Sequence, residues 1–204
     1  LGIVLWCRGK PKWAVAVLAL ALLAKEITLL FVFGLIASSL VGKKPKEALL
    51  AALASLPLAA WQGCLFLKFG AFPMTAGPPL ERIPLNGIIP HLSFEPGRLS
   101  AFLFVGLPGL ALLFASLHYL SRGGGHPERW WLLLQSLFVV LMPLATYDHI
   151  MAAGRNGCGL VLSALFLFPI VNKHLRVLSM CCWILPTLVW MIPVWIMAPW
   201  HIRA

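Results

Sequence analysis

A single apolar stretch near the N-terminus, residues 13–41, constrains the fold more than any other feature of the sequence. It carries no charge except the adjacent pair Lys25 and Glu26. As one straight helix its 29 residues would reach about 43 Å, against roughly 30 Å of bilayer hydrocarbon. Each charge at the centre of a membrane helix costs about 2.5–3.5 kcal/mol on insertion scales, and adjacent residues do not face each other. The stretch therefore has to tilt or break, and the pair needs partners from elsewhere.

Similar apolar runs recur along the chain and predict an all-α polytopic membrane protein. The sequence is 61% hydrophobic and 11% charged, whereas soluble domains are about half apolar and a quarter charged. We expect about five transmembrane helices plus one broken or re-entrant helical hairpin, in a single transmembrane domain over residues 1–204. The expected spans, besides residues 13–41, are 47–67, 99–120, 130–146, 157–171 and 177–198.

The distribution of basic residues distinguishes a hairpin from a single crossing at residues 13–41. A hairpin puts ten Lys and Arg residues on one side and five on the other, whereas a single crossing gives seven and eight. The positive-inside rule favours the asymmetric arrangement. We therefore predict two half-helices that meet near Lys25–Glu26, with Lys43 on the cytoplasmic side. The ten residues are Arg8, Lys10, Lys12, Lys43, Lys44, Lys46, Arg122, Arg129, Lys173 and Arg176, and the five are Lys68, Arg82, Arg98, Arg155 and Arg203.

Several other classes of function are disfavoured. The net charge of +10 does not indicate nucleic acid, because the basic residues form short clusters between apolar runs. We expect no metal site, since the five cysteines have no C-x-x-C spacing and fit small apolar packing residues. His91 and Glu95 are four residues apart but are flanked by prolines. Tryptophans near the span ends predict an aromatic belt at the membrane interfaces; these are Trp13, Trp61, Trp130, Trp131 and Trp200.

A candidate substrate site follows from the predicted helix break. A break would place Lys25 and Glu26 at the floor of a cavity open to the outer side, where a charged ligand binds. Thr28 would add a hydroxyl group there. The alternative is a buried ion-pair network that only fixes helix packing.

The outer-side loop "YDHIMAAGRN" supplies further candidates for substrate binding. Arg155 is suited to bidentate contact with a phosphate, and its alternative role is a snorkelling interfacial anchor. Asp148 and His149 are candidates for acid–base work, and their alternative is a solvated pair. The long loop at residues 68–98 faces the same side, and loops of this length are usually functional or flexible.

Short motifs resemble bacterial GT-C-type membrane glycosyltransferases, a superfamily similar to the protein mannosyltransferases and the lipid A aminoarabinose transferases. The resemblance covers residues 1–80 and 147–175. The chain departs from the family pattern after Gln62, where the aromatic residue, Phe66, comes one position late. The matching motifs are Ala24-Lys25-Glu26, Trp61-Gln62, Phe69-Gly70-Ala71-Phe72-Pro73 and the stretch "AAGRNGCGLVLSALF" at residues 152–166.

The resemblance implies transfer of a sugar from a polyprenyl-phosphate carrier to an acceptor on the outer face of the bacterial inner membrane. Lys25 and Arg155 would contact the lipid phosphate or line the donor pocket, and Glu26 would orient a partner near the acceptor. The family carries its catalytic carboxylate in the first outer loop, which this sequence lacks. We therefore expect a downstream fragment whose catalytic base lies upstream of Leu1, with membrane lipid and the lipid-linked donor as partners and no other cofactor.

Two alternatives remain beside the transferase. A broken helix with charges at mid-membrane is also how transporters build their sites, so a transporter or flippase for an anionic or lipid-linked substrate is the first. The second is a catalytically inactive membrane relative, which the missing acidic loop favours.

Overall fold

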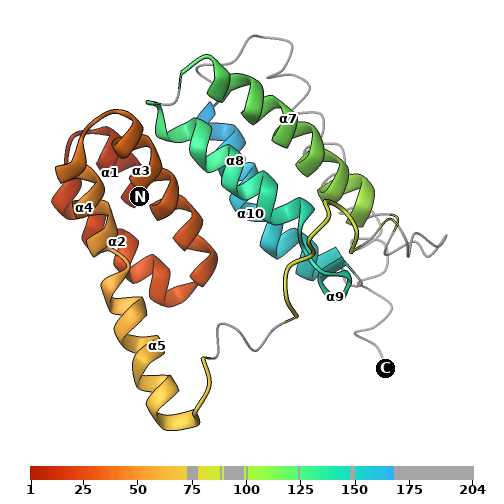
Figure 1. Ribbon diagram of the computed structural model, residues 1–204, viewed down its shortest axis with the longest axis horizontal. Coiled ribbons are helices and arrows are strands. Elements are labelled where there is room, and N and C mark those ends of the chain that lie inside the picture. The colour runs from red at the N-terminus through yellow and green to blue at the C-terminus, as the bar shows by residue number, and fades with distance from the viewer. Residues whose placement is uncertain are drawn as a thin grey trace, which may run out of the picture.

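The structure is a computed structural model that describes residues 1–72, 78–87, 89, 99, 101–123, 125–147 and 150–167. All regular elements in these residues are helices (Figure 1), which confirms the all-α class. They are α1 (Gly2–Cys7), α2 (Pro11–Ala24), the 3-10 turn η1 (Glu26–Thr28), α3 (Leu29–Val41), α4 (Pro45–Leu53), α5 (Leu56–Phe69), the π-helical turn η4 (Phe102–Gly106), α7 (Leu107–Ser121), α8 (Pro127–Val140), α9 (Leu144–Tyr147) and α10 (Ile150–Leu167).

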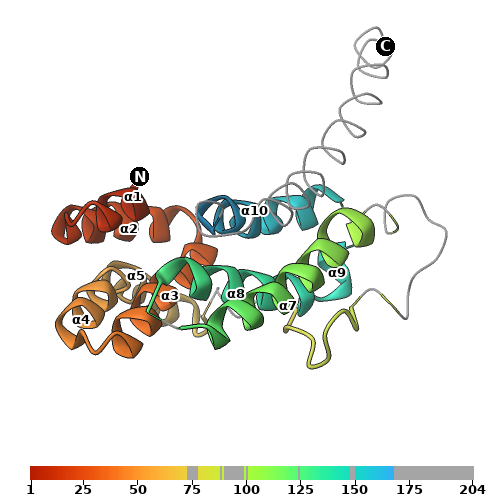
Figure 2. The same cartoon turned by 90° about the horizontal axis from the view of Figure 1, so that it is seen from above.

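The helices form two layers and two apolar cores. Figure 2 shows α1, α2 and α10 in one layer and α3, α4, α8 and α7 in the other. One core joins helices α1 to α5 around Leu22, Leu35 and Trp131, and the other joins α7, α8 and α10 around Leu132 and Leu160. Helix α8 contributes to both cores, so it connects the two halves of the molecule.

The contact between α3 and α8 depends on a close approach at Gly34. Trp131 of α8 is fully buried, and its Nε1 donates a hydrogen bond to the carbonyl oxygen of Phe31 at 2.9 Å. A Cβ at Gly34 would overlap the indole ring of Trp131. The prediction that Trp131 belongs to an aromatic belt is therefore wrong. Trp13 and Trp61, by contrast, are 69% and 54% exposed.

The predicted break at Lys25–Glu26 is confirmed. Helix α2 ends at Ala24, Lys25 has extended backbone angles (φ −157°, ψ 115°), and η1 leads into α3. Pro11 at the start of α2 and Gly42 after the end of α3 line one cavity. The two half-helices therefore begin and end at the same end of the molecule, as the charge distribution predicts.

The predicted spans are only partly recovered. Among the described residues, Phe102–Ser121 is a single helix of 20 residues that is long and apolar enough to cross a membrane. Helices α4 and α5 satisfy the same criteria only as a pair bent by 42°. A proline explains the bend, because Pro57 lacks the N–H that would bond to the carbonyl of Leu53. The predicted span at 177–198 lies outside the described residues.

Two predicted boundaries near residue 150 need correction. Helix α8 ends at Val140 rather than near Thr146, and Pro143 follows shortly after its C-cap, where proline is common. Helix α10 already begins at Ile150, so most of the predicted loop "YDHIMAAGRN" is helical. Arg155 therefore lies within α10 and not in a loop before it.

Candidate functional site

Lys25 and Glu26 lie at the break between α2 and α3, and backbone hydrogen bonds continue on both sides of Lys25. The Lys25 N–H donates to the carbonyl of Ala21 at 2.9 Å, and the Thr28 N–H donates to the carbonyl of Lys25 at 3.1 Å. Lys25 is partly buried and Glu26 is exposed. Because its side chain is exposed, Glu26 is accessible to a ligand.

The C-terminal half of α10 is the part of that helix nearest to this break. Helix α10 contacts η1, and the ring of Phe166 lies 5.6 Å from that of Trp131, edge to face. Trp131 in turn bonds to Phe31 at the start of α3. Arg155 precedes Phe166 by 11 residues, which corresponds to about 16 Å along the helix. The proposed contact of Arg155 with the same ligand as Lys25 and Glu26 stays a prediction.

The remaining candidates from the outer-side loop are only partly placed. Asp148 and His149 lie outside the described residues. Tyr147, just before them, is fully buried, and its hydroxyl donates to the carbonyl of Val139 at 2.6 Å. This bond fixes α9 against the end of α8.

The sequence analysis did not predict the buried polar side chain between α8 and α10. Gln135 is fully buried, and neither atom of its amide has a hydrogen-bond partner among the described residues. A Cβ at Gly159 of α10 would overlap this amide. The glycine therefore makes room for the glutamine. The sequence signal was a glutamine inside an apolar run, "LLLQSLF".

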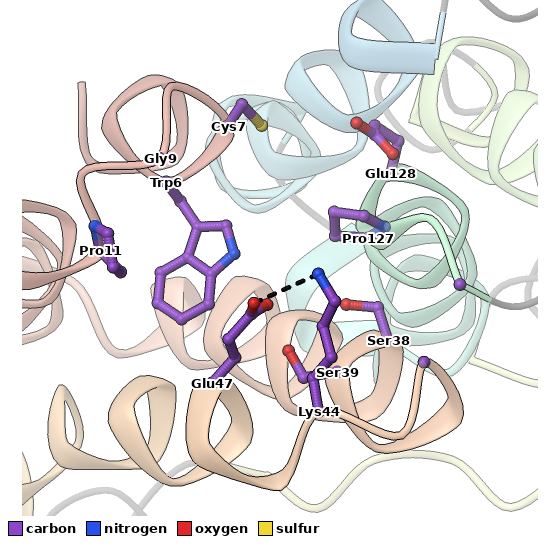
Figure 3. Close-up of a pocket in the computed structure, with 12 residues that line it drawn as sticks. Trp6, Cys7, Gly9, Pro11, Ser38, Ser39, Lys44, Glu47, Pro127 and Glu128 are labelled. Atoms are coloured by element: carbon purple, nitrogen blue, oxygen red, sulfur yellow. Dashed lines mark ion pairs between the residues drawn. The ribbon is translucent and has the colours of Figure 1, made fainter.

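A cavity of about 420 Å³ lies at the opposite end of the α2–α3 hairpin. We call it the basic-end cavity. It is lined by three segments that are far apart in the sequence: the α1–α2 turn, the stretch from the end of α3 to the start of α4, and the start of α8 (Figure 3). Its charged lining residues are Lys44, Glu47 and Glu128. About 21 Å of helix α2 separates it from Lys25, so it is a second site and not the predicted cavity at the helix break.

The charges in the basic-end cavity are unequally compensated. Lys44 Nζ lies 3.2 Å from Glu47 Oε1, and both side chains are substantially exposed. Glu128 Oε2 is buried and has no hydrogen-bond partner among the described residues. Burial raises the pKa of the Cys7 thiol, and the nearby charge of Glu128 raises that pKa further. Both effects favour the neutral form of the thiol.

Comparison with protein-family models, with curated proteins and with solved structures gives no match to this chain.

Proposed function

We propose that the chain is a multi-pass protein of the bacterial inner membrane and part of a membrane glycosyltransferase that uses a polyprenyl-phosphate sugar donor. The observation that carries this proposal is the interruption of an apolar helical hairpin at Lys25–Glu26. Ionisable residues within membrane segments are rare and mark ligand or ion sites, which supports a functional role for this charged pair.

Exposed apolar side chains support the membrane location. Leu20, Leu49 and Phe114 are 69%, 68% and 64% exposed, and Leu67 near the end of α5 is 86% exposed. They lie on α2, α4, α7 and α5, respectively, and further large apolar side chains are exposed on the same helices. Exposed apolar surface on this scale is unusual for a soluble monomer and fits contact with lipid.

In the proposed reaction the leaving group is an anionic lipid phosphate. Lys25 stabilises the negative charge that develops on this phosphate, in a poorly solvated site where such interactions are strong. Glu26 is exposed beside it and orients the acceptor. Arg155 lies in α10, about 16 Å along that helix from Phe166. It would contact the donor only if the donor lipid extends along α10.

A second candidate function is transport of an anionic or lipid-linked substrate. The same observation favours it, because transporters place their sites at discontinuous helices with freed backbone groups near the membrane centre. The two functions differ in chemistry: a transferase breaks the bond between sugar and phosphate, whereas a transporter moves the lipid intact.

The hairpin topology is tested by placing a cysteine at position 26 in a background without native cysteines. Glu26→Cys should react with a membrane-impermeant thiol reagent added outside the cell. Lys43→Cys, at the other end of the hairpin, is the matched control and should react only from the cytoplasmic side. Labelling of position 26 from the cytoplasmic side alone would contradict the topology.

The ligand is tested with purified protein and undecaprenyl phosphate, with binding measured by native mass spectrometry. Lys25→Gln should lose binding, whereas Lys12→Gln, which removes the same charge at the opposite end of α2, should retain it. Equal binding by both variants would refute the role of Lys25. With a labelled lipid-linked sugar in proteoliposomes, release of the sugar from its lipid supports the transferase, and movement of the intact lipid supports the transporter.

A further inference from the structure

Among the residues that the structure describes, the charges that line the basic-end cavity leave one carboxylate without a counter-ion. Lys44 is paired with Glu47, and the thiol of Cys7 cannot serve as a counter-ion because it carries no positive charge. Among the described residues, Glu128 has neither an ion pair nor a hydrogen bond to its buried Oε2. The N-terminus of α8 offsets part of the resulting cost, because Glu128 lies in its first turn. A cation bound in the cavity would remove the rest.

The walls of the cavity suit an organic cation better than a metal ion or an anion. The indole of Trp6 extends into the cavity from α1, and Pro127 and Glu128 face it from α8 (Figure 3). Aromatic rings attract ammonium groups to their faces. A hard metal cation such as Ca²⁺ takes 6–8 oxygen ligands, more than these aromatic and proline walls supply. Two carboxylates in the lining oppose an anion.

Hydroxyl groups complete the polar lining. Ser38 and Ser39 of α3 are buried and reach the cavity. The Ser38 hydroxyl donates to the carbonyl of Leu35 at 3.0 Å, so its oxygen lone pairs are free to accept a hydrogen bond from a ligand. A primary ammonium group has three N–H donors. Glu128 and the serine hydroxyls therefore offer acceptors for such a group, beside an aromatic ring.

We propose that the basic-end cavity binds a primary ammonium group, with Glu128 as its counter-ion and Trp6 as its aromatic wall. The site lies apart from Lys25 and Glu26 and is independent of the proposed transfer reaction. Both an aminolipid headgroup and a soluble amine carry this group. Basic residues that neighbour the lining residues in the sequence attract phosphate at a membrane surface, and they would hold the phosphate of an aminolipid. They are Arg8, Lys10, Lys43 and Lys46.

The test uses the alkylation rate of Cys7, which lines the cavity, in the full chain purified in a non-ionic detergent. The probes are ethanolamine, dihexanoyl phosphatidylethanolamine and dihexanoyl phosphatidylglycerol. Cys64 on α5 is the internal control, because it is exposed and does not line the cavity. At a concentration ten times its Kd, a bound amine should slow alkylation of Cys7 about tenfold and leave Cys64 unchanged.

The outcomes separate the sources of the ligand and can overturn the proposal. Protection by both amines indicates that a free ammonium group suffices, and protection by phosphatidylethanolamine alone indicates an aminolipid. Equal protection by phosphatidylglycerol, or no protection by either amine, overturns the proposal with the wild-type protein alone.

A pair of variants tests the counter-ion. Glu128→Gln should abolish the protection of Cys7, measured as the ratio of rates with and without the probe in the same variant. Glu81→Gln removes an exposed carboxylate that bonds to Asn86, and it should keep the protection. Retained protection in a folded Glu128→Gln protein would exclude Glu128 as the counter-ion and overturn the proposal.

Discussion

The close approach of α3 to α8 makes Gly34→Ala the most informative single substitution for this fold. The added methyl group would overlap Trp131 Cδ1 and lie 2.9 Å from Nε1 and 3.2 Å from the backbone nitrogen of Trp131. The indole ring cannot move aside easily, because Phe31 and Phe166 flank it at ring distances of 6.0 and 5.6 Å. Displacing it would also break its hydrogen bond to the Phe31 carbonyl.

The expected loss follows from these contacts. Overpacking costs about 1–3 kcal/mol and a lost hydrogen bond about 0.5–1.5 kcal/mol, while replacing a helical glycine with alanine returns about 1 kcal/mol. Gly34→Ala should therefore destabilise the protein by roughly 0.5–3.5 kcal/mol, which is a drop of several degrees in Tm. The matched control is Gly63→Ala in α5, where nothing lies within 4 Å of an added Cβ, and which should stabilise its helix.

The assay is thermal unfolding in detergent, followed by circular dichroism of the helical signal. Trp131→Ala should remove most of the effect of Gly34→Ala, because alanine lacks the ring atoms Cδ1 and Nε1 that the added methyl group meets, so the two substitutions are not additive. A Tm for Gly34→Ala equal to that of Gly63→Ala, with both at or above wild type, would refute the described contact.

Three further predictions concern other parts of the molecule. Glu128→Gln should lower the raised pKa of the Cys7 thiol, so that alkylation of Cys7 at pH 8 becomes faster while alkylation of Cys64 does not. An unchanged rate for Cys7 would contradict the electrostatic coupling. Gly159→Ala should lower Tm, because its methyl group would overlap the buried Gln135 amide; a rise in Tm would argue against that packing. Gly70 ends α5 in the left-handed conformation (φ 71°), which an alanine adopts at a cost of about 1 kcal/mol. Gly70→Ala should therefore speed deuterium exchange in the last turn of α5 about fivefold. Unchanged exchange would count against this cap.

The break between α2 and α3 could be predicted from the sequence because its cause is local. Lys25 and Glu26 are neighbours in an apolar run, and the cost of their charges is visible without knowing any partner. The bend between α4 and α5 was also local, since Pro57 removes one hydrogen bond, but an apolar run that contains a proline has the composition of a continuous span. Composition alone therefore overestimated the lengths of the helices.

The features that depend on distant partners were not predictable. Trp131 lies near the end of an apolar run, which is where interfacial tryptophans occur, yet its partner Phe31 is 100 residues away. Only the absence of a side chain at Gly34 permits that contact. The basic-end cavity is assembled from three separate segments, and none of them carries a motif on its own. Glu128 in sequence is simply an acidic residue in the first turn of a helix.

The hairpin of α2 and α3 has a consequence for how the rest of the chain is oriented. Because both of its ends lie at one end of the molecule, it would enter the membrane without carrying any hydrophilic segment across. In the proposed topology, deleting residues 11–41 would therefore leave every later helix pointing the same way, whereas deleting a single crossing would invert them all. In that topology the hairpin would add the proposed binding site without changing which side the loops face.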